Sequence, residues 1–186
     1  MSRKDQKLNA LISELSAAEG QKFSKSLQIL KNEGSVNVLR SLATLLMIKG
    51  LEEQQEILDL LGDLNESAAV DEMIEILRDE QFLAVRQPLL TTIWNSKLNY
   101  SYYLPEFVEI AVDGDFMEAL DCLTILENME GPFEERQILE AQLHLKDYLE
   151  DTAPKEQQKA KIMSEITLWL KDLSDLDDDD ISSFMD

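Results

Sequence analysis

The chain has little of the side-chain chemistry that most enzymes use, since one cysteine and one histidine occur among its 186 residues. Cys122 cannot form a disulfide within the chain, and free thiols are typical of reducing compartments, so we expect a cytoplasmic protein. Cys122 lies in the apolar segment ALDCLTIL and His144 lies in LEAQLHLKDYL, where both are expected to be structural. Glycine-rich phosphate loops, nucleophile elbows and Cys-x-x-Cys pairs are absent from the sequence. We therefore predict a protein that is not an enzyme and has no cofactor or metal.

Long apolar runs are also absent. No stretch of about eighteen apolar residues occurs, so the sequence predicts no transmembrane helix and no membrane partner. The N-terminal sequence MSRKDQKLNALISEL is charged and then amphipathic, which is not the pattern of a cleavable leader. We expect a chain that is soluble and is not exported.

Basic residues are few, and they are unevenly distributed. The chain has 17 Lys and Arg residues against 38 Asp and Glu residues, which gives a net charge of −21. Residues 1–50 have a net charge of +4, whereas residues 51–131, with three basic and nineteen acidic residues, have −16. Such a surface repels phosphate, so nucleic-acid binding is not expected. It would attract a basic protein surface, although acidic helices that only keep the chain in solution also fit the composition.

Apolar residues recur at three- and four-residue steps along the chain, and the alternation of β-strands is missing. This periodicity predicts an all-α fold. The ten expected helices cover residues 4–18, 21–33, 36–49, 52–63, 67–79, 82–97, 101–113, 115–129, 133–150 and 155–173. Because the connections are short, consecutive helices should be antiparallel neighbours, which gives about five helical hairpins. We assign residues 1–173 to one helical domain and the acidic residues 174–186 to a disordered tail.

Glycine and proline are scarce, with six and four residues, and they interrupt the helical pattern. The glycines expected just past helix ends, where a positive φ is needed, are Gly20, Gly34, Gly50, Gly114 and Gly131. In the turn VDGD, Asp115 is expected to be the N-cap of the following helix. Pro88 lies inside an expected helix and predicts either a kink or a helix that begins near Gln87.

The sequence repeats itself at an offset of 34 residues. The stretch LNESAAVDEMIEILRDEQFLAVRQPLL, residues 64–90, aligns with LNYSYYLPEFVEIAVDGDFMEALDCLT, residues 98–124. Identical pairs at this offset include Leu64 and Leu98, Ser67 and Ser101, Glu72 and Glu106, Ile76 and Ile110, Asp79 and Asp113, Phe82 and Phe116, and Leu89 and Leu123. Asp147 continues the series of Asp79 and Asp113. A period of about 20–50 residues is typical of solenoids, in which each unit buries its apolar face against its neighbours.

The segment ILDLLGDLNESAAVDEMIEILRDEQFLAVRQPLL resembles the HEAT repeat, and within that family the short PBS-lyase HEAT-like units. The features that carry the resemblance are LG-D-L at the end of one helix, Ala69-Val70 opening the next, Ile74, Ile76 and Leu77 along it, Arg78-Asp79 at its end and Val85-Arg86 in the second helix. The resemblance implies a right-handed α-α superhelix, a HEAT/ARM-like solenoid. It also implies that Asp79 accepts backbone N–H groups in its turn and that Arg86 bridges neighbouring turns, whereas Leu120 replaces the arginine in the second repeat.

The function that the resemblance implies is protein binding, so the leading hypothesis is a non-catalytic adaptor or scaffold with a basic protein partner. Phycobilin lyases of HEAT type handle a linear tetrapyrrole, and this cofactor-handling activity is the alternative. DNA glycosylases of HEAT-like fold need a basic groove, which the acidic central section contradicts. Tetratricopeptide repeats share the 34-residue period and are the second choice of architecture, but their W-L-G-Y pattern is not found here.

Two groups of residues are candidates for partner binding. The first is an aromatic group near the junction of the two aligned repeats, because Tyr and Trp are common interface anchors; its members are Trp94, Tyr100, Tyr102 and Tyr103, with Phe107 beside them. The second is the acidic tail, whose apolar residues Ile181, Phe184 and Met185 are spaced as on a helix that folds onto a partner. Packing between hairpins for the aromatics, and a purely solubilising role for the tail, are the structural alternatives.

Overall fold

The computed structural model describes residues 3–33 and 36–183, and over these residues the chain is all-helical, without a β-strand. The α-helices of this part are α1 (Arg3–Ala17), α2 (Gly20–Glu33), α3 (Leu39–Leu46), α4 (Leu51–Gly62), α5 (Ala68–Arg78), α6 (Leu83–Trp94), α7 (Leu104–Asp113), α8 (Phe116–Glu127), α9 (Glu135–Glu150) and α10 (Gln157–Ser183). Short 3₁₀ turns lead into α3, α6 and α7, namely η1 (Val36–Val38), η2 (Glu80–Phe82) and η3 (Ser101–Tyr103). None of the described helices is both long enough and apolar enough to cross a lipid bilayer.

Each of the ten predicted ranges overlaps one of these helices, so the all-α prediction is confirmed. The differences lie at the helix ends, where residues 36–38, 82 and 101–103, which we expected in first helical turns, belong to 3₁₀ turns instead. The last helix shows the largest difference, because α10 continues past residue 173 to Ser183. It therefore extends over most of the segment 174–186 that we expected to be a disordered tail.

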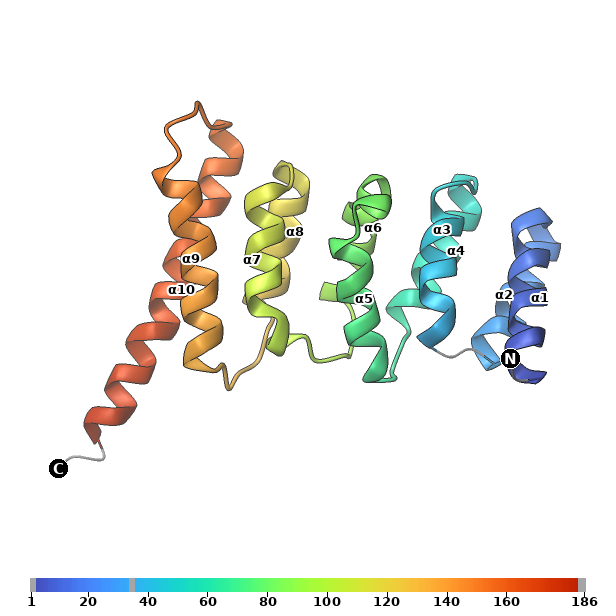
Figure 1. Ribbon diagram of the computed structural model, residues 1–186, viewed down its shortest axis with the longest axis horizontal. Coiled ribbons are helices and arrows are strands. Elements are labelled where there is room, and N and C mark those ends of the chain that lie inside the picture. Colours follow the sequence, from blue (N-terminus) through green and yellow to red (C-terminus); the bar gives the residue numbers. More distant parts are fainter. Residues whose placement is uncertain (1–2, 34–35, 184–186) are drawn as a thin grey trace. The chain divides into compact units, whose positions relative to one another are not determined.

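Residues 1–98 form the first of two compact units, the N-terminal unit. Its helices pair as α1 with α2, α3 with α4, and α5 with α6 (Figure 1). The second helices of these hairpins also pack in a row, α2 on α4 and α4 on α6, while α3 packs on α5. Leu15, Leu42, Ile57, Leu77 and Leu89 are among the fully buried side chains, so the apolar stripe of each helix is covered by its neighbours.

Residues 99–186 form the C-terminal unit, which has two hairpins. Here α7 pairs with α8 and α9 with α10, while α7 also packs on α9 and α8 on α10. Phe107, Cys122, Met163 and Ile166 are completely buried between these helices. In both units, then, each hairpin buries its apolar side against the hairpin that follows it or precedes it.

Polar contacts link consecutive hairpins of the N-terminal unit at a nearly constant distance along the sequence. The backbone N–H of Gly20 donates to Glu53, Ser24 donates to Glu56, Lys31 pairs with Asp63 and Arg40 pairs with Glu72, with sequence separations of 33, 32, 32 and 32 residues. Contacts of this kind stabilise an exposed surface only weakly. Their nearly constant spacing is close to the 34-residue offset of the internal repeat.

Two lysines donate hydrogen bonds to carbonyl groups at helix C-termini. Carbonyl groups at these positions have no hydrogen-bond partner inside their own helix. The Nζ atom of Lys49 donates to the carbonyls of Ser16 and Ala18 at the end of α1. Similarly, the Nζ atom of Lys159 donates to the carbonyls of Val112 and Gly114 at the end of α7. Partial burial lowers the pKa of Lys159, although four nearby carboxylates, Asp113 first among them, favour its charged form.

The turn between α7 and α8 confirms one capping prediction and corrects another. The side chain of Asp115 accepts from the backbone N–H of Glu118, and Glu118 in turn accepts from the N–H of Asp115, so Asp115 is the N-cap as expected. Gly114, however, has φ −74° and not a positive φ. A Cβ at this position would lie 2.7 Å from the carbonyl oxygen of Ile110, so the glycine is needed for close backbone approach.

The other glycines also test the prediction of a positive φ. Among the described glycines, Gly20 alone has a positive φ, of 51°, whereas Gly50 is the extended N-cap of α4. The prediction of positive φ is therefore right for Gly20 and wrong for Gly50, Gly114 and Gly131, and Gly34 lies outside the described residues. Pro88 lies within α6, which begins at Leu83 and not near Gln87.

The carboxylate of Asp79 caps η2, because it accepts from the backbone N–H of Gln81 at 2.9 Å, as predicted for this turn. The guanidinium of Arg40 in α3 also donates to Asp79 and, at 3.3 Å, to Glu72. These contacts hold the pKa of the Asp79 carboxyl below its ordinary value of 3.8, with the Gln81 hydrogen bond as the largest cause and Arg40 as the next. Arg40 was not among the residues that the sequence pattern singled out.

Replacing Leu77 by alanine should lower the free energy of unfolding of the N-terminal unit by about 2–5 kcal/mol, because a fully buried leucine leaves a cavity. Leu51→Ala is the matched control, since Leu51 is 85% exposed, and it should change stability by no more than about 0.5 kcal/mol. Urea denaturation of the full chain, followed by hydrogen exchange of α5, measures both. A loss below about 1 kcal/mol for Leu77→Ala would contradict the packing described here.

Stability should also depend on the protonation of Asp79. A carboxyl whose pKa is lowered in the folded state adds stability at pH values above its unfolded pKa, ordinarily 3.8, and this stability is lost as the pH falls through the lower folded pKa. The difference in stability between the natural chain and Asp79→Asn should therefore be largest near neutral pH and should shrink in acid. Denaturant titrations across this range measure it, with Glu80→Gln as a control that removes the neighbouring charge. A difference that does not change with pH would rule out the proposed contribution of the Asp79 charge.

Candidate functional site

The candidate aromatic residues belong to different units and are therefore described separately. Trp94 is the last residue of α6 in the N-terminal unit, where its side chain is 42% exposed. Tyr100, Tyr102 and Tyr103 lie at η3 in the C-terminal unit. An exposed Trp at a helix end is available to a partner, so Trp94 remains a candidate.

The tyrosines of η3 differ in their exposure. Tyr100 is 5% exposed and lies edge-on to Phe107, with ring centroids 6.1 Å apart, and burial raises the pKa of its hydroxyl. Tyr102 is 67% exposed and meets the ring of Tyr103 edge-on at 5.5 Å. The side-chain amide of Gln137 in α9 donates to the Tyr102 carbonyl at 2.6 Å, which ties η3 to α9. Tyr100 thus packs in the core, as the structural alternative predicted, and Tyr102 presents its ring to solvent.

The apolar residues of the predicted tail cannot be placed as a binding surface. Ile181 lies in the backbone range of α10, but its side chain is not described. Phe184 and Met185 lie outside the described residues. Their role in partner binding stays a prediction from the sequence.

The two side chains that were considered for chemistry, those of Cys122 and His144, are fully and partly buried. Cys122 is completely buried in α8, and His144 is half-buried in α9. Within the residues that the structure describes, no group of three or more His, Cys, Asp and Glu side chains could hold a metal ion. Burial removes the Cys122 thiol from solvent, which is the setting of an inert cysteine.

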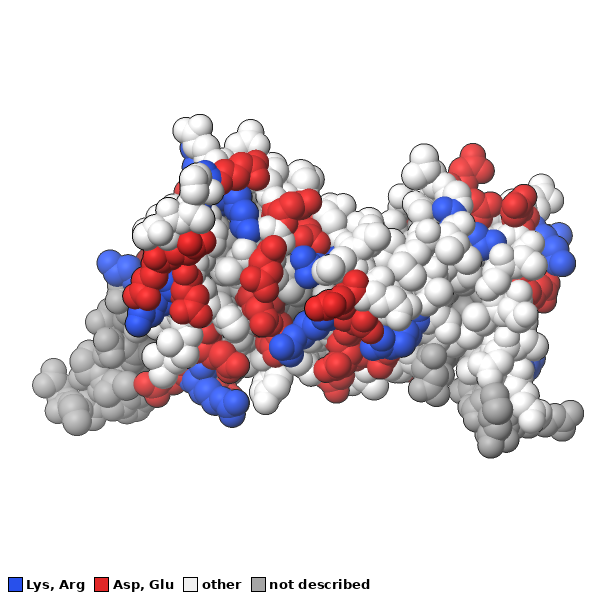
Figure 2. Space-filling view, turned by 45° about the horizontal axis from the view of Figure 1, so that its top comes forward, with Lys and Arg blue, Asp and Glu red and all other residues white. Residues whose placement is uncertain are grey.

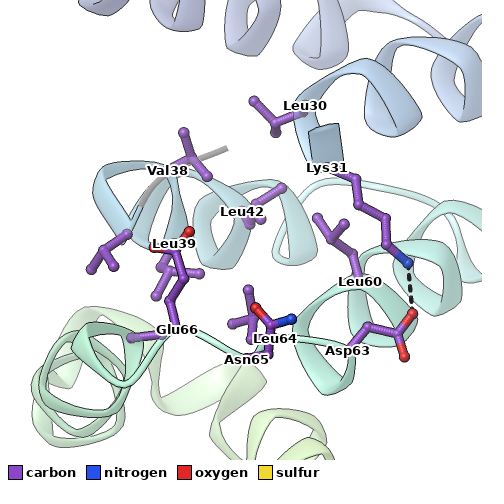
Figure 3. A pocket seen from close by; sticks show the side chains of 12 residues that line it. Leu30, Lys31, Val38, Leu39, Leu42, Leu60, Asp63, Leu64, Asn65 and Glu66 are labelled. Atoms are coloured by element: carbon purple, nitrogen blue, oxygen red, sulfur yellow. Dashed lines mark hydrogen bonds and ion pairs between the residues drawn. The ribbon is translucent and has the colours of Figure 1, made fainter. Parts of the chain in front are cut away.

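A small pocket lies between α2, α3, α4 and the start of α5 (Figure 3). Its volume is about 170 Å³, and apolar side chains form most of its wall, among them Leu30, Leu39, Leu42 and Leu60. The ion pair between Lys31 and Asp63, with Nζ and Oδ2 2.6 Å apart, lies at its edge. The space is too small for a drug-sized ligand, for which pockets of about 300 Å³ or more are usual.

A larger groove crosses the C-terminal halves of α2, α4 and α6, and we call it the α2–α4–α6 groove. It consists of two hollows that share Asp59 and Asp63, one of about 540 Å³ between α4 and α6 and one of about 190 Å³ between α2 and α4. The first hollow is lined by Gln55, Leu58, Asp59, Gly62, Asp63, Thr91, Thr92, Trp94 and Asn95, and the second also by Ser24, Leu27, Gln28, Lys31, Glu56 and Leu60. Most of these side chains are polar or acidic.

A third groove, between α9 and α10 in the C-terminal unit, differs in character. Its volume is about 500 Å³, and Leu145, Leu149 and Leu170 supply its apolar wall. Lys146, Lys171 and Glu150 also line it, and Lys146 pairs with Glu150 at 3.8 Å. It is an apolar channel flanked by charges of both signs with a small positive excess, in contrast to the α2–α4–α6 groove.

The excess of acidic residues belongs mainly to the C-terminal unit. Residues 1–98 include eleven basic and fifteen acidic side chains, net −4, whereas residues 99–186 include six and twenty-three, net −17. Figure 2 shows Asp and Glu side chains from the left to the middle of the face in view, with Lys and Arg side chains between them. A field of this sign favours encounter with cationic partners.

Sequence analysis did not identify the α2–α4–α6 groove, although one local signal pointed to it. Asp59 lies in the last turn of α4 and Asp63 is its C-cap, and no basic residue occurs in that turn. Carboxylates are normally disfavoured at a helix C-terminus, where the helix dipole is negative. A pair of them at such a place is a local conflict that could have been noted from the helix boundaries alone.

Comparison with known proteins identifies no relative, because no family model, no curated protein and no solved structure matches the chain.

Proposed function

We propose that the chain is a non-catalytic adaptor whose hairpins form a right-handed α-α superhelix of HEAT type and bind a protein with a basic surface. The carrying observation is that hairpins in each unit pack on the adjacent hairpin, with polar links in the N-terminal unit that recur at 32–33 residues. This spacing matches the 34-residue repeat of the sequence. Repeat architectures of this kind expose long continuous faces, which serve mainly as binding surfaces.

Charge supports a basic protein as the partner. The net charge of −17 over residues 99–186 opposes phosphate and attracts clustered Lys and Arg side chains. Exposed apolar side chains such as Tyr102, Leu143 and Leu168 on the same unit would supply short-range contacts after the encounter. Nucleic acid is therefore not the proposed partner.

A binding role is favoured over a catalytic one by the placement of the only thiol, which is fully buried in α8. No observation on the described residues favours the tetrapyrrole-handling alternative. The single cysteine of the sequence supports the cytoplasm as the proposed location.

Affinity capture with the full chain as bait, from the cells that produce it, should recover a basic protein at a fixed stoichiometry. Retention should fall steeply between about 0.1 M and about 1 M salt, because the Debye length shrinks from about 10 Å to about 3 Å. Quantitative mass spectrometry of the eluates at several salt concentrations measures this dependence.

A bait with Glu127→Gln, Glu130→Gln and Glu140→Gln, three exposed positions of the C-terminal unit, should retain less of the partner at low salt. The control bait carries Gln157→Asn and Gln158→Asn at exposed positions of α10 and keeps its charge. Recovery of an acidic protein, or retention that is insensitive to salt, would contradict the proposal.

A further inference from the structure

We propose that the α2–α4–α6 groove binds an extended peptide segment whose Arg or Lys side chains are spaced about three residues apart. The inference rests on the proposed function, because it assigns to a basic segment of the partner a site in the N-terminal unit, in addition to the acidic surface of the C-terminal unit. Two observations support it, the charge at the helix ends and the exposed ring of Trp94, and the usual distance between packed helices gives the spacing of the cations.

The groove lies where three helices end on the same side of the N-terminal unit. As second helices of consecutive hairpins, α2, α4 and α6 run in the same direction, so their C-termini and the negative ends of their dipoles lie together. Neither α4 nor α6 has a basic residue in its last turn. Asp59 and Asp63 add carboxylates to this negative edge. Lys31 in the last turn of α2 and Lys97 after α6 act on Asp63, so the part of the groove that is complementary to a further cation is the part around Asp59.

The carboxylates of the groove differ in their contacts, because one forms an ion pair and the others accept hydrogen bonds from neutral groups. Asp63 pairs with Lys31 at 2.6 Å, and Glu56 accepts a hydrogen bond from Ser24 at 2.8 Å. Asp59 is exposed and accepts from the side-chain amide of Gln55 at 2.8 Å. A neutral amide does not compensate the charge of a carboxylate, so Asp59 is the strongest position for an incoming guanidinium or ammonium group.

Trp94 completes the wider hollow. Its exposed ring lines the same space as Asp59, on the opposite helix of the α4–α6 pair. An aromatic face beside a carboxylate binds a guanidinium by stacking and by charge, and Trp is the best aromatic partner for a cation. The amide of Asn95 also lines this hollow and can bond to a peptide backbone.

The two hollows set the spacing of the cations. Packed helices lie about 8–10 Å apart, and a peptide extended in the polyproline II conformation advances about 3.1 Å per residue with about three residues per turn, so every third side chain is on the same face. A peptide that crosses the row from α6 to α2 therefore places every third side chain over a new hollow. The first cation would lie between Trp94 and Asp59, and the next beside Glu56.

The test uses a labelled peptide of about twelve residues, with arginine at every third position and alanine and serine between. Trp169→Phe serves as the background, because it leaves Trp94 as the one Trp of the sequence. Binding should change the Trp94 fluorescence and raise the anisotropy of the peptide label. Asp59→Asn and Trp94→Ala should each weaken binding about fivefold or more, a loss of about 1 kcal/mol, while circular dichroism stays unchanged.

Glu75→Gln is the matched control, because it removes one charge from an exposed position of α5 outside the groove, and it should weaken binding less than about twofold. A second peptide with glutamine in place of arginine should not bind. Equal losses for Glu75→Gln and Asp59→Asn, or peptide binding without a change in Trp94 fluorescence, would overturn the assignment of the groove and leave the basic partner standing. Failure of both the arginine peptide and the affinity capture would instead overturn the proposed function.

Discussion

A helical hairpin with one apolar side can bury that side only against another hairpin, and this constraint governs both units. Within the N-terminal unit, α4 is covered by α2, α3 and α6, and Ile57 at its centre is fully buried. Burial of this kind requires the same apolar positions in every hairpin, so the sequence repeats with the length of the hairpin. Polar contacts between hairpins therefore join residues at a similar sequence separation, which is 32 residues both for Lys31 with Asp63 and for Arg40 with Glu72.

The positions of the helices could be predicted because the apolar period of an α-helix is a property of the local sequence. The geometry of the turns could not be predicted equally well. Gly20 has the positive φ expected after a helix, but Gly114 is required because a Cβ would collide with the carbonyl of Ile110. A glycine in a sequence indicates that a side chain is not tolerated, without distinguishing a dihedral requirement from a steric one. Only the neighbouring backbone decides between them.

Residue partnerships were harder to predict than residue positions. Asp79 accepts the N–H of Gln81, a contact between near neighbours that the turn pattern indicated. Its contact with Arg40 spans 39 residues and joins two hairpins, and one sequence cannot reveal which distant guanidinium reaches a given carboxylate. The aromatic residues show the same limit. Tyr100 and Tyr102 are two positions apart, yet Tyr100 is buried and Tyr102 is exposed. A short 3₁₀ turn sends adjacent side chains in different directions, and the composition of the cluster does not show which ring faces solvent.

The carboxylates at the end of α4 are best understood as a local conflict that the rest of the unit tolerates. Both Asp59 and Asp63 lie where the helix dipole disfavours negative charge, and Lys31 offsets this at Asp63 through an ion pair. At Asp59 the contact is a neutral amide, that of Gln55, beside an exposed Trp. Residues that break a local rule without a compensating contact tend to mark functional sites, because stability there is subordinate to binding. The groove between α9 and α10 also has a carboxylate in the last turn of a helix, that of Glu150, but Lys146 pairs with it at 3.8 Å. The edge of α4 is therefore the stronger position for a ligand, and the ligand that would relieve its conflict is a cation.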